Sequence, residues 1–198
     1  LVKAAPDDPY FLELEGQIML ESGDPRGALV PLRKATIATN YQPLIATSFG
    51  HALIATEDPA NLAEAEKVLR QAVARDTENP FAWYQLGTVY ERKGDEARTA
   101  LATAERANLT GDPGTAMVSA RRAMVGLPQG SSDWIRAQDI MMVSQTAWEE
   151  LKRKGTIDFL DNRLDTASGT MRLRAKVPNP DGFLTPGMFG RVAIQGSP

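Results

Sequence analysis

Few residues in this chain are of the types that carry out catalysis or bind metals. His51 is the only histidine, and the sequence contains no cysteine. Because a zinc site needs several converging histidine, cysteine or carboxylate ligands, a lone histidine predicts no metal site. Glu149 and Glu150 are adjacent, so on a helix they point in different directions and form no acid–base pair. We find no nucleophile–base arrangement and no phosphate-binding loop, and we expect no enzymatic activity and no cofactor.

The composition narrows the possible partners. The 198 residues carry a net charge of −3, which argues against nucleic-acid binding because phosphate neutralisation needs a basic surface. No apolar run is long enough to cross a bilayer, so we expect no membrane span. The chain opens LVKAAPDDPY with no signal peptide, and we interpret it as a fragment of a longer protein.

Small residues recur through the first part of the chain at a regular spacing. Gly16, Gly50 and Gly87 are separated by 34 and 37 residues, a period typical of stacked helix–turn–helix repeats. Two antiparallel helices approach closely only where side chains are small, and Leu32 and Leu69 can fill the volume beside them. The other small residues of this pattern are Gly23, Ala28, Ala35, Ala65, Ala72, Gly94, Ala100 and Ala107.

Turn residues predict where the helices begin. Several sites combine a capping side chain with a proline that the first helical turn tolerates. These sites are Asp24-Pro25, Asp58-Pro59, Asn79-Pro80 and Asp112-Pro113. We expect a mainly α solenoid of about eight helices over residues 1–154, ended by a helix from Ser131 or Ser132 to Leu151.

The fourth repeat is less regular. Ala116, Ala120 and Ala123 match the second helix of a repeat. Residues 95–110 would then serve both as the partner of helix 80–93 and as the first helix of the fourth repeat.

The third repeat, NPFAWYQLGTVYERKGD, resembles the tetratricopeptide (TPR) consensus. This resemblance implies an inner groove that binds a protein or peptide ligand. The groove residues that it implies are Tyr10, Glu13, Gln17, Thr47, His51, Tyr84, Thr88 and Glu91. Two interpretations stay open for them: contact with a peptide, or solvation of a concave face. Glu13 and Glu91 would oppose an acidic peptide.

A second resemblance covers residues 1–150. The segment LPQGSSDWIRAQDI is similar to the C-terminal TPR half of BepA-like zinc metallopeptidases of the bacterial envelope. This implies a periplasmic location and repeats that engage client proteins and outer-membrane assembly machinery. The HExxH motif of that family is absent from this chain, so the resemblance implies no protease activity.

After Lys154 the hydrophobic period becomes two, which predicts β-strands. Met171, Leu173, Ala175 and Val177 alternate with basic residues and indicate a half-buried strand. Ile157 and Phe159 indicate an earlier strand, and Met188, Val192 and Ile194 a later one, giving a short three-stranded segment. Because three strands bury little core, we expect the segment to pair with another chain, dock on the helices or stay mobile.

Residues 155–198 contain the motifs DTASGT, PNP and LTPGM. With these motifs the segment is similar to the β-barrel domain of periplasmic adaptors (membrane fusion proteins) of RND efflux pumps. We therefore divide the chain into a TPR domain, 1–154, and a partial β-barrel segment, 155–198, with a junction near 148–155. The favoured function is a non-catalytic binding module, the partner-binding tail of an envelope metallopeptidase. The alternatives are an efflux adaptor component or an artificial fusion of the two families.

Overall fold

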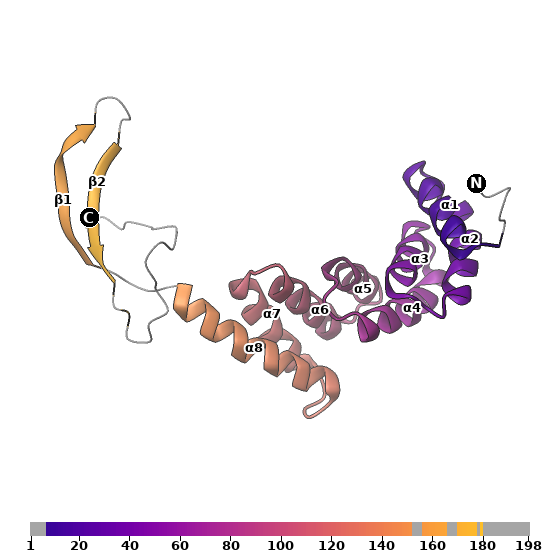
Figure 1. The fold of residues 1–198 in the computed structure, drawn as a ribbon. Helices are drawn as coiled ribbons and strands as arrows, with labels where there is room; N and C mark the ends of the chain where they lie inside the picture. The colour runs from indigo at the N-terminus through magenta and orange to yellow at the C-terminus, as the bar shows by residue number, and fades with distance from the viewer. Residues whose placement is uncertain (1–6, 152–155, 166–169, 178, 180–198) are drawn as a thin grey trace. The chain divides into compact units, whose positions relative to one another are not determined.

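The structure, a computed structural model, describes residues 7–151, 156–165, 170–177 and 179. These residues form eight α-helices, one short 3-10 helix and two strands (Figure 1). The helices are α1 (Pro9–Glu21), α2 (Pro25–Ala38), α3 (Pro43–Ala55), α4 (Leu62–Arg75), α5 (Pro80–Arg92), α6 (Glu96–Leu109), α7 (Pro113–Gly126) and α8 (Ser132–Leu151), and the 3-10 helix η1 is Pro59–Asn61. The chain divides into two compact units, Leu1–Trp148 and Glu149–Pro198.

The predicted helix starts at Pro25, Pro80 and Pro113 are confirmed, and side-chain caps explain them. Asp58-Pro59 instead begins the 3-10 helix η1, and α4 follows at Leu62. Five helices, α1, α2, α3, α5 and α7, begin on a proline, whose missing N–H leaves no helical hydrogen bond unmade at that position. Before α5, the side chain of Asn79 accepts hydrogen bonds from the backbone N–H groups of Phe81 (3.0 Å) and Ala82 (3.1 Å). Side-chain caps also precede α1, α2, α3, α6 and α7.

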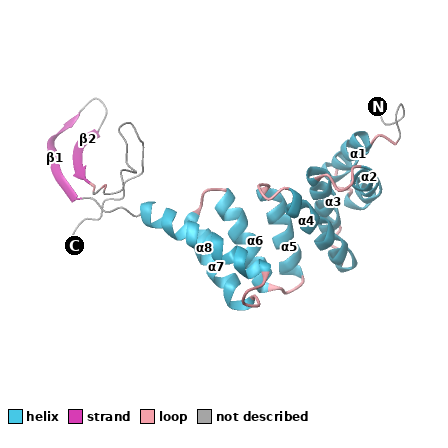
Figure 2. Ribbon diagram, turned by 60° about the horizontal axis from the view of Figure 1, so that its bottom comes forward, coloured by secondary structure: helices cyan, strands magenta, loops and turns pink. Residues whose placement is uncertain are grey.

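Helices α1 to α8 form a mainly α, TPR-like solenoid of successive helical pairs, as the sequence predicts (Figures 1 and 2). From α1 to α7, each α-helix packs against the next along the chain. Helix α6 packs against both α5 and α7, as the expectation for the fourth repeat requires. Gly114, at the start of α7, packs against the ring of Trp148 near the end of α8.

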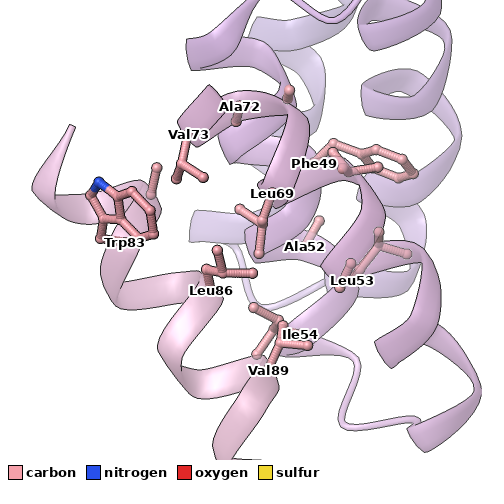
Figure 3. Close-up of a cluster of buried hydrophobic side chains, with 14 of the residues drawn as sticks. Phe49, Ala52, Leu53, Ile54, Leu69, Ala72, Val73, Trp83, Leu86 and Val89 are labelled. Atoms are coloured by element: carbon pink, nitrogen blue, oxygen red, sulfur yellow. The ribbon is translucent and has the colours of Figure 1, made fainter. Parts of the chain in front are cut away.

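Gly16, Gly50 and Gly87 lie where the helices cross, as predicted, whereas Gly23 and Gly94 lie in turns at positive φ. A Cβ atom on Gly50 would lie 2.5 Å from Cγ of Leu69, and one on Gly16 would overlap Leu32. At Gly87 the neighbour is smaller, and a Cβ would lie 3.3 Å from Cβ of Ala102. Leu69 is fully buried, with Ala52 of α3 and Leu86 of α5 in the same core cluster (Figure 3).

The second unit contains an antiparallel hairpin of β1 (Thr156–Asp165) and β2 (Thr170–Lys176). These strands confirm the two that the sequence predicts around Phe159 and Leu173, whereas the later strand at Met188, Val192 and Ile194 lies outside the described residues. The described apolar side chains of the hairpin are exposed rather than half-buried: Ile157 by 42%, Phe159 by 50% and Leu173 by 41%. Within the described part of the chain this sheet has two strands, and two strands bury little apolar surface.

Candidate functional site

Three large apolar side chains are exposed at the same place in successive repeats. Tyr10, Leu44 and Phe81 each follow the proline that begins α1, α3 and α5, and their exposed fractions are 66%, 61% and 46%. The sequence reasoning included Tyr10 and missed Leu44 and Phe81. The signal that could have found them is their identical offset from the helix-initial proline. We call the side of the solenoid that carries them the first-helix surface.

A hollow of about 280 Å³ lies on this surface between α1, α3 and α5. Its lining residues are Gln17, Leu20, Glu21, Ser48, His51 and Phe81. Glu13 lies next to it, where its carboxylate accepts hydrogen bonds from Nε2 of Gln17 and, at 3.5 Å, from Oγ of Ser48. Gln17 and His51 from the predicted set therefore share one hollow, and Glu13 orients one of its walls.

His51 is half-buried, and its ring meets the ring of Phe81 edge-on, with centroids 5.5 Å apart and an angle of 87° between the planes. Burial lowers the pKa of His51 below its usual value of 6.5. The imidazole is therefore neutral at pH 7, with one nitrogen that donates and one that accepts a hydrogen bond.

The predicted residues of α5 line a second hollow, of about 120 Å³. Tyr84 is 52% exposed there, and the guanidinium carbon of Arg106 lies 5.6 Å from the centre of its ring. Thr88 and Glu91 line the same hollow. Glu91 also lines a larger hollow of about 430 Å³ that extends to α7. Because the two hollows share lining residues, they follow one another along the solenoid.

Thr47 is the member of the predicted set that offers no group to a ligand. It is only 3% exposed, and its hydroxyl donates to the carbonyl oxygen of Pro43 at 2.8 Å within its own helix. Its repeat position indicates an exposed residue, but a short β-branched side chain with a backbone acceptor one turn away folds back onto the helix.

A partly buried set of ion pairs lies at the contact between α6 and α8. Arg136 donates to the carboxylate of Glu105, which is 5% exposed, and its guanidinium lies 4.9 Å from the ring centre of Trp83. Nε of Arg98 donates to Asp133 at 3.0 Å. Burial raises the pKa of Glu105, and the bond from Arg136 opposes that rise. Since both of these cations have a carboxylate partner, we assign the ion pairs to holding α8 in place rather than to binding a ligand.

Among the described residues, no group of three or more histidine, cysteine, aspartate or glutamate side chains is placed to hold a metal ion. None of the helices in that part of the chain is long and apolar enough to cross a membrane.

Comparison with known proteins finds different relatives for the C-terminal part of the chain and for the helices. The family model of the CusB-like β-barrel domain matches residues 123–198, which is less than half of the chain. The multidrug efflux pump subunit AcrA of Escherichia coli K12 is 32% identical over 85 residues, covering 36% of this chain and 21% of AcrA. The efflux pump periplasmic linker BepD of Brucella suis is 51% identical over 41 residues, 21% of this chain and 10% of BepD. The chain thus spans about a fifth or less of the length of these relatives.

The solved structures that resemble the chain resemble its helices. A crystal structure of MamA superimposes with a TM-score of 0.51 over 75% of this chain and 83% of that chain, at 20% identity. A second MamA structure gives a TM-score of 0.52 at 18% identity, over 75% of this chain and 74% of that one. At these identities the likeness concerns the fold alone. The findings support a helical fold like that of MamA, joined to a segment similar to efflux adaptors.

Proposed function

We propose that this chain is a non-catalytic protein-binding module of a bacterial envelope protein and that its first-helix surface holds an extended polypeptide segment. The observation that carries this proposal is the row of Tyr10, Leu44 and Phe81, exposed at one position of three successive repeats. Exposed aromatic side chains beside preformed hollows are typical anchors of protein interfaces.

The polar groups of the surface suggest what the segment carries. Glu21 lines the hollow between α1, α3 and α5, and Glu13 lies beside it, whereas no lysine or arginine of the described residues lines it, so a neutral or basic segment is favoured there. In the hollows along α5, Arg106 and Arg122 accompany Glu91. The neutral imidazole of His51 can bond to a peptide N–H or carbonyl group. The proposed contact set is Tyr10, Glu13, Gln17, Leu44, His51, Phe81, Tyr84, Thr88 and Glu91.

Selection from a displayed library of random peptides on the full chain tests the proposal. Phe81→Ala and Tyr84→Ala should each weaken a selected peptide by about tenfold or more, the loss typical of an interface anchor. Ile37→Ala is the matched control, because Ile37 is 62% exposed on the second helix α2. Equal loss in the control, or none in the two variants, would refute the binding surface.

The periplasm is the proposed location, since the relatives of residues 123–198 include a protein named as a periplasmic linker. The finer proposal, that the helices form the tail of a zinc metallopeptidase, is supported by the motif in residues 127–140 alone. Sequencing the gene upstream of the codon for Leu1 tests it, because an HExxH-bearing domain should be encoded there.

A second candidate function, part of an efflux adaptor, is favoured by the family match of residues 123–198. The match begins within α7, upstream of the junction proposed near 148–155, which favours one continuous adaptor-like segment over a fusion at that point. Phe159→Asp and Leu173→Asp test this candidate. Loss of association with pump components, with peptide binding retained, would assign assembly to the hairpin and support separate domains 1–154 and 155–198.

A further inference from the structure

One face of α1 is exposed although the same face is buried in the other first helices. Leu14 and Ile18 are 43% and 56% exposed, and Phe11 beside them is half-buried. Moving along the chain by the repeat spacing of 34 residues gives Ile45, Ser48 and Ala52 of α3, and by a further 37 gives Ala82, Gln85 and Val89 of α5.

Those equivalent positions are almost all inaccessible. Ala52 and Val89 are 0% exposed, and Gln85 is 4% exposed. They are buried because α3 packs against α1 and α2, and α5 packs against α3 and α4. The face of α1 made by Phe11, Leu14 and Ile18 therefore has the position and the side chains of an interior repeat contact. We call it the open α1 face.

The negative charge of α1 limits which surfaces can cover the open α1 face. Helix α1 carries Glu13, Glu15 and Glu21 and no basic residue, so pairing two α1 helices would bring like charges together. The covering surface must be apolar and neutral or basic.

Helix α7 presents such a surface. Val118 and Val125 are 62% and 87% exposed, and Arg121, which lies between them in the sequence, is also exposed. Spacings of three, four and seven residues place these three side chains along one side of the helix. Helix α7 contains Arg121 and Arg122 and no acidic residue. Arg122 pairs with Glu96 of α6 at 3.0 Å, so Arg121 supplies the charge opposite to that of α1.

We propose that the open α1 face docks on the α7 face of Val118, Arg121 and Val125 in a second copy of this chain. The contact buries apolar side chains at its centre and places Arg121 near glutamates at its edge. Because it joins two different surfaces, each copy keeps one unused face, and the association continues head to tail. The inference does not depend on peptide binding at the first-helix surface.

Light scattering coupled to gel filtration of the full chain tests this proposal. The wild-type mass should rise above the 21.5 kDa of one chain as concentration increases. Leu14→Lys, which places a lysine opposite Arg121, and Val118→Glu, which places a glutamate opposite the acidic α1, should each weaken association by about tenfold or more. Ile37→Lys, on an exposed position of α2, should behave as wild type.

Mixing the two variants gives the decisive result. A Leu14→Lys chain retains its α7 face and a Val118→Glu chain retains its α1 face, so a one-to-one mixture should form a complex of two chains and no larger species. Far-UV circular dichroism confirms that each variant stays helical. A wild-type chain that is monomeric at all concentrations, or a mixture that stays monomeric, overturns the proposal and assigns the open α1 face to a different partner.

Discussion

Replacing Gly50 by alanine and replacing Gly87 by alanine should change the stability of the protein in different ways. Gly50 and Gly87 occupy the same position of successive repeats, but their neighbours differ. A Cβ at residue 50 would lie 2.5 Å from Cγ and 2.6 Å from Cδ2 of Leu69, whereas at residue 87 the nearest atom is Cβ of Ala102 at 3.3 Å. Leu69 is fully buried and cannot turn away, so Gly50→Ala overpacks the crossing.

Whether each substitution stabilises or destabilises the protein depends on the balance between overpacking and helix propensity. Overpacking a core costs about 1–3 kcal/mol, and replacing glycine by alanine inside a helix returns about 1 kcal/mol. We expect Gly50→Ala to lower the free energy of unfolding by about 1 kcal/mol. At Gly87 a shift of a few tenths of an ångström suffices, so helix propensity dominates, and Gly87→Ala should be neutral or stabilising by up to about 1 kcal/mol.

Urea unfolding of the full chain, followed by far-UV circular dichroism, measures both effects as changes in the midpoint at constant slope. Leu69→Ala supplies the matched test of the cause. That variant alone should lose about 2–5 kcal/mol, but in its background Gly50→Ala should become stabilising because the clash is gone. Gly50→Ala protein as stable as wild type, or still destabilised after Leu69→Ala, would refute close helix packing at residue 50.

Three further predictions concern side chains at the surface and at the α8 contact. The single imidazole of His51 should titrate by proton NMR with a pKa below 6.5, because burial disfavours its charged form, and a value of 6.5 or above would contradict its placement. Burial raises the pKa of Glu105, so ionisation of this carboxyl destabilises the fold as pH rises above about 4.5. The free energy of unfolding of Glu105→Gln relative to wild type should therefore increase between pH 4 and pH 7. A difference between the two proteins that does not change with pH would exclude a raised pKa for Glu105. Asn79→Ala should lower the free energy of unfolding by about 1 kcal/mol in urea titrations, because the α5 cap is lost. Asn79→Asp should retain most of the wild-type stability, because aspartate can accept the same hydrogen bonds.

The helical stack could be predicted because its signals are local and repeated. Aspartate or asparagine before proline acts within the first turn of its own helix, and glycine at a crossing acts between two helices that are adjacent in the chain, as Gly50 does with Leu69. The assignment of α7 within a helical pair stays a prediction, because Ala116, Ala120 and Ala123 fit either helix of a pair.

The site was only partly predictable, for different physical reasons. Phe81 and Leu44 are large and apolar, and such residues are usually expected in the core, yet their helix position exposes them. The pair of Arg136 and Glu105 joins residues 31 apart and depends on how α8 packs, which no local pattern contains. The hairpin strands followed from their period of two, but the exposure of their apolar side chains depends on what lies beside them.

The first-helix surface is proposed to bind an extended polypeptide. Mapping chemical-shift changes in the full chain on addition of a library-selected peptide tests this proposal most directly. We predict that the largest changes occur at Tyr10, His51 and Tyr84, with little change at Val30 and Ile37 on α2. Changes confined to α2, or the same binding in a Phe81→Ala variant, would contradict the claim.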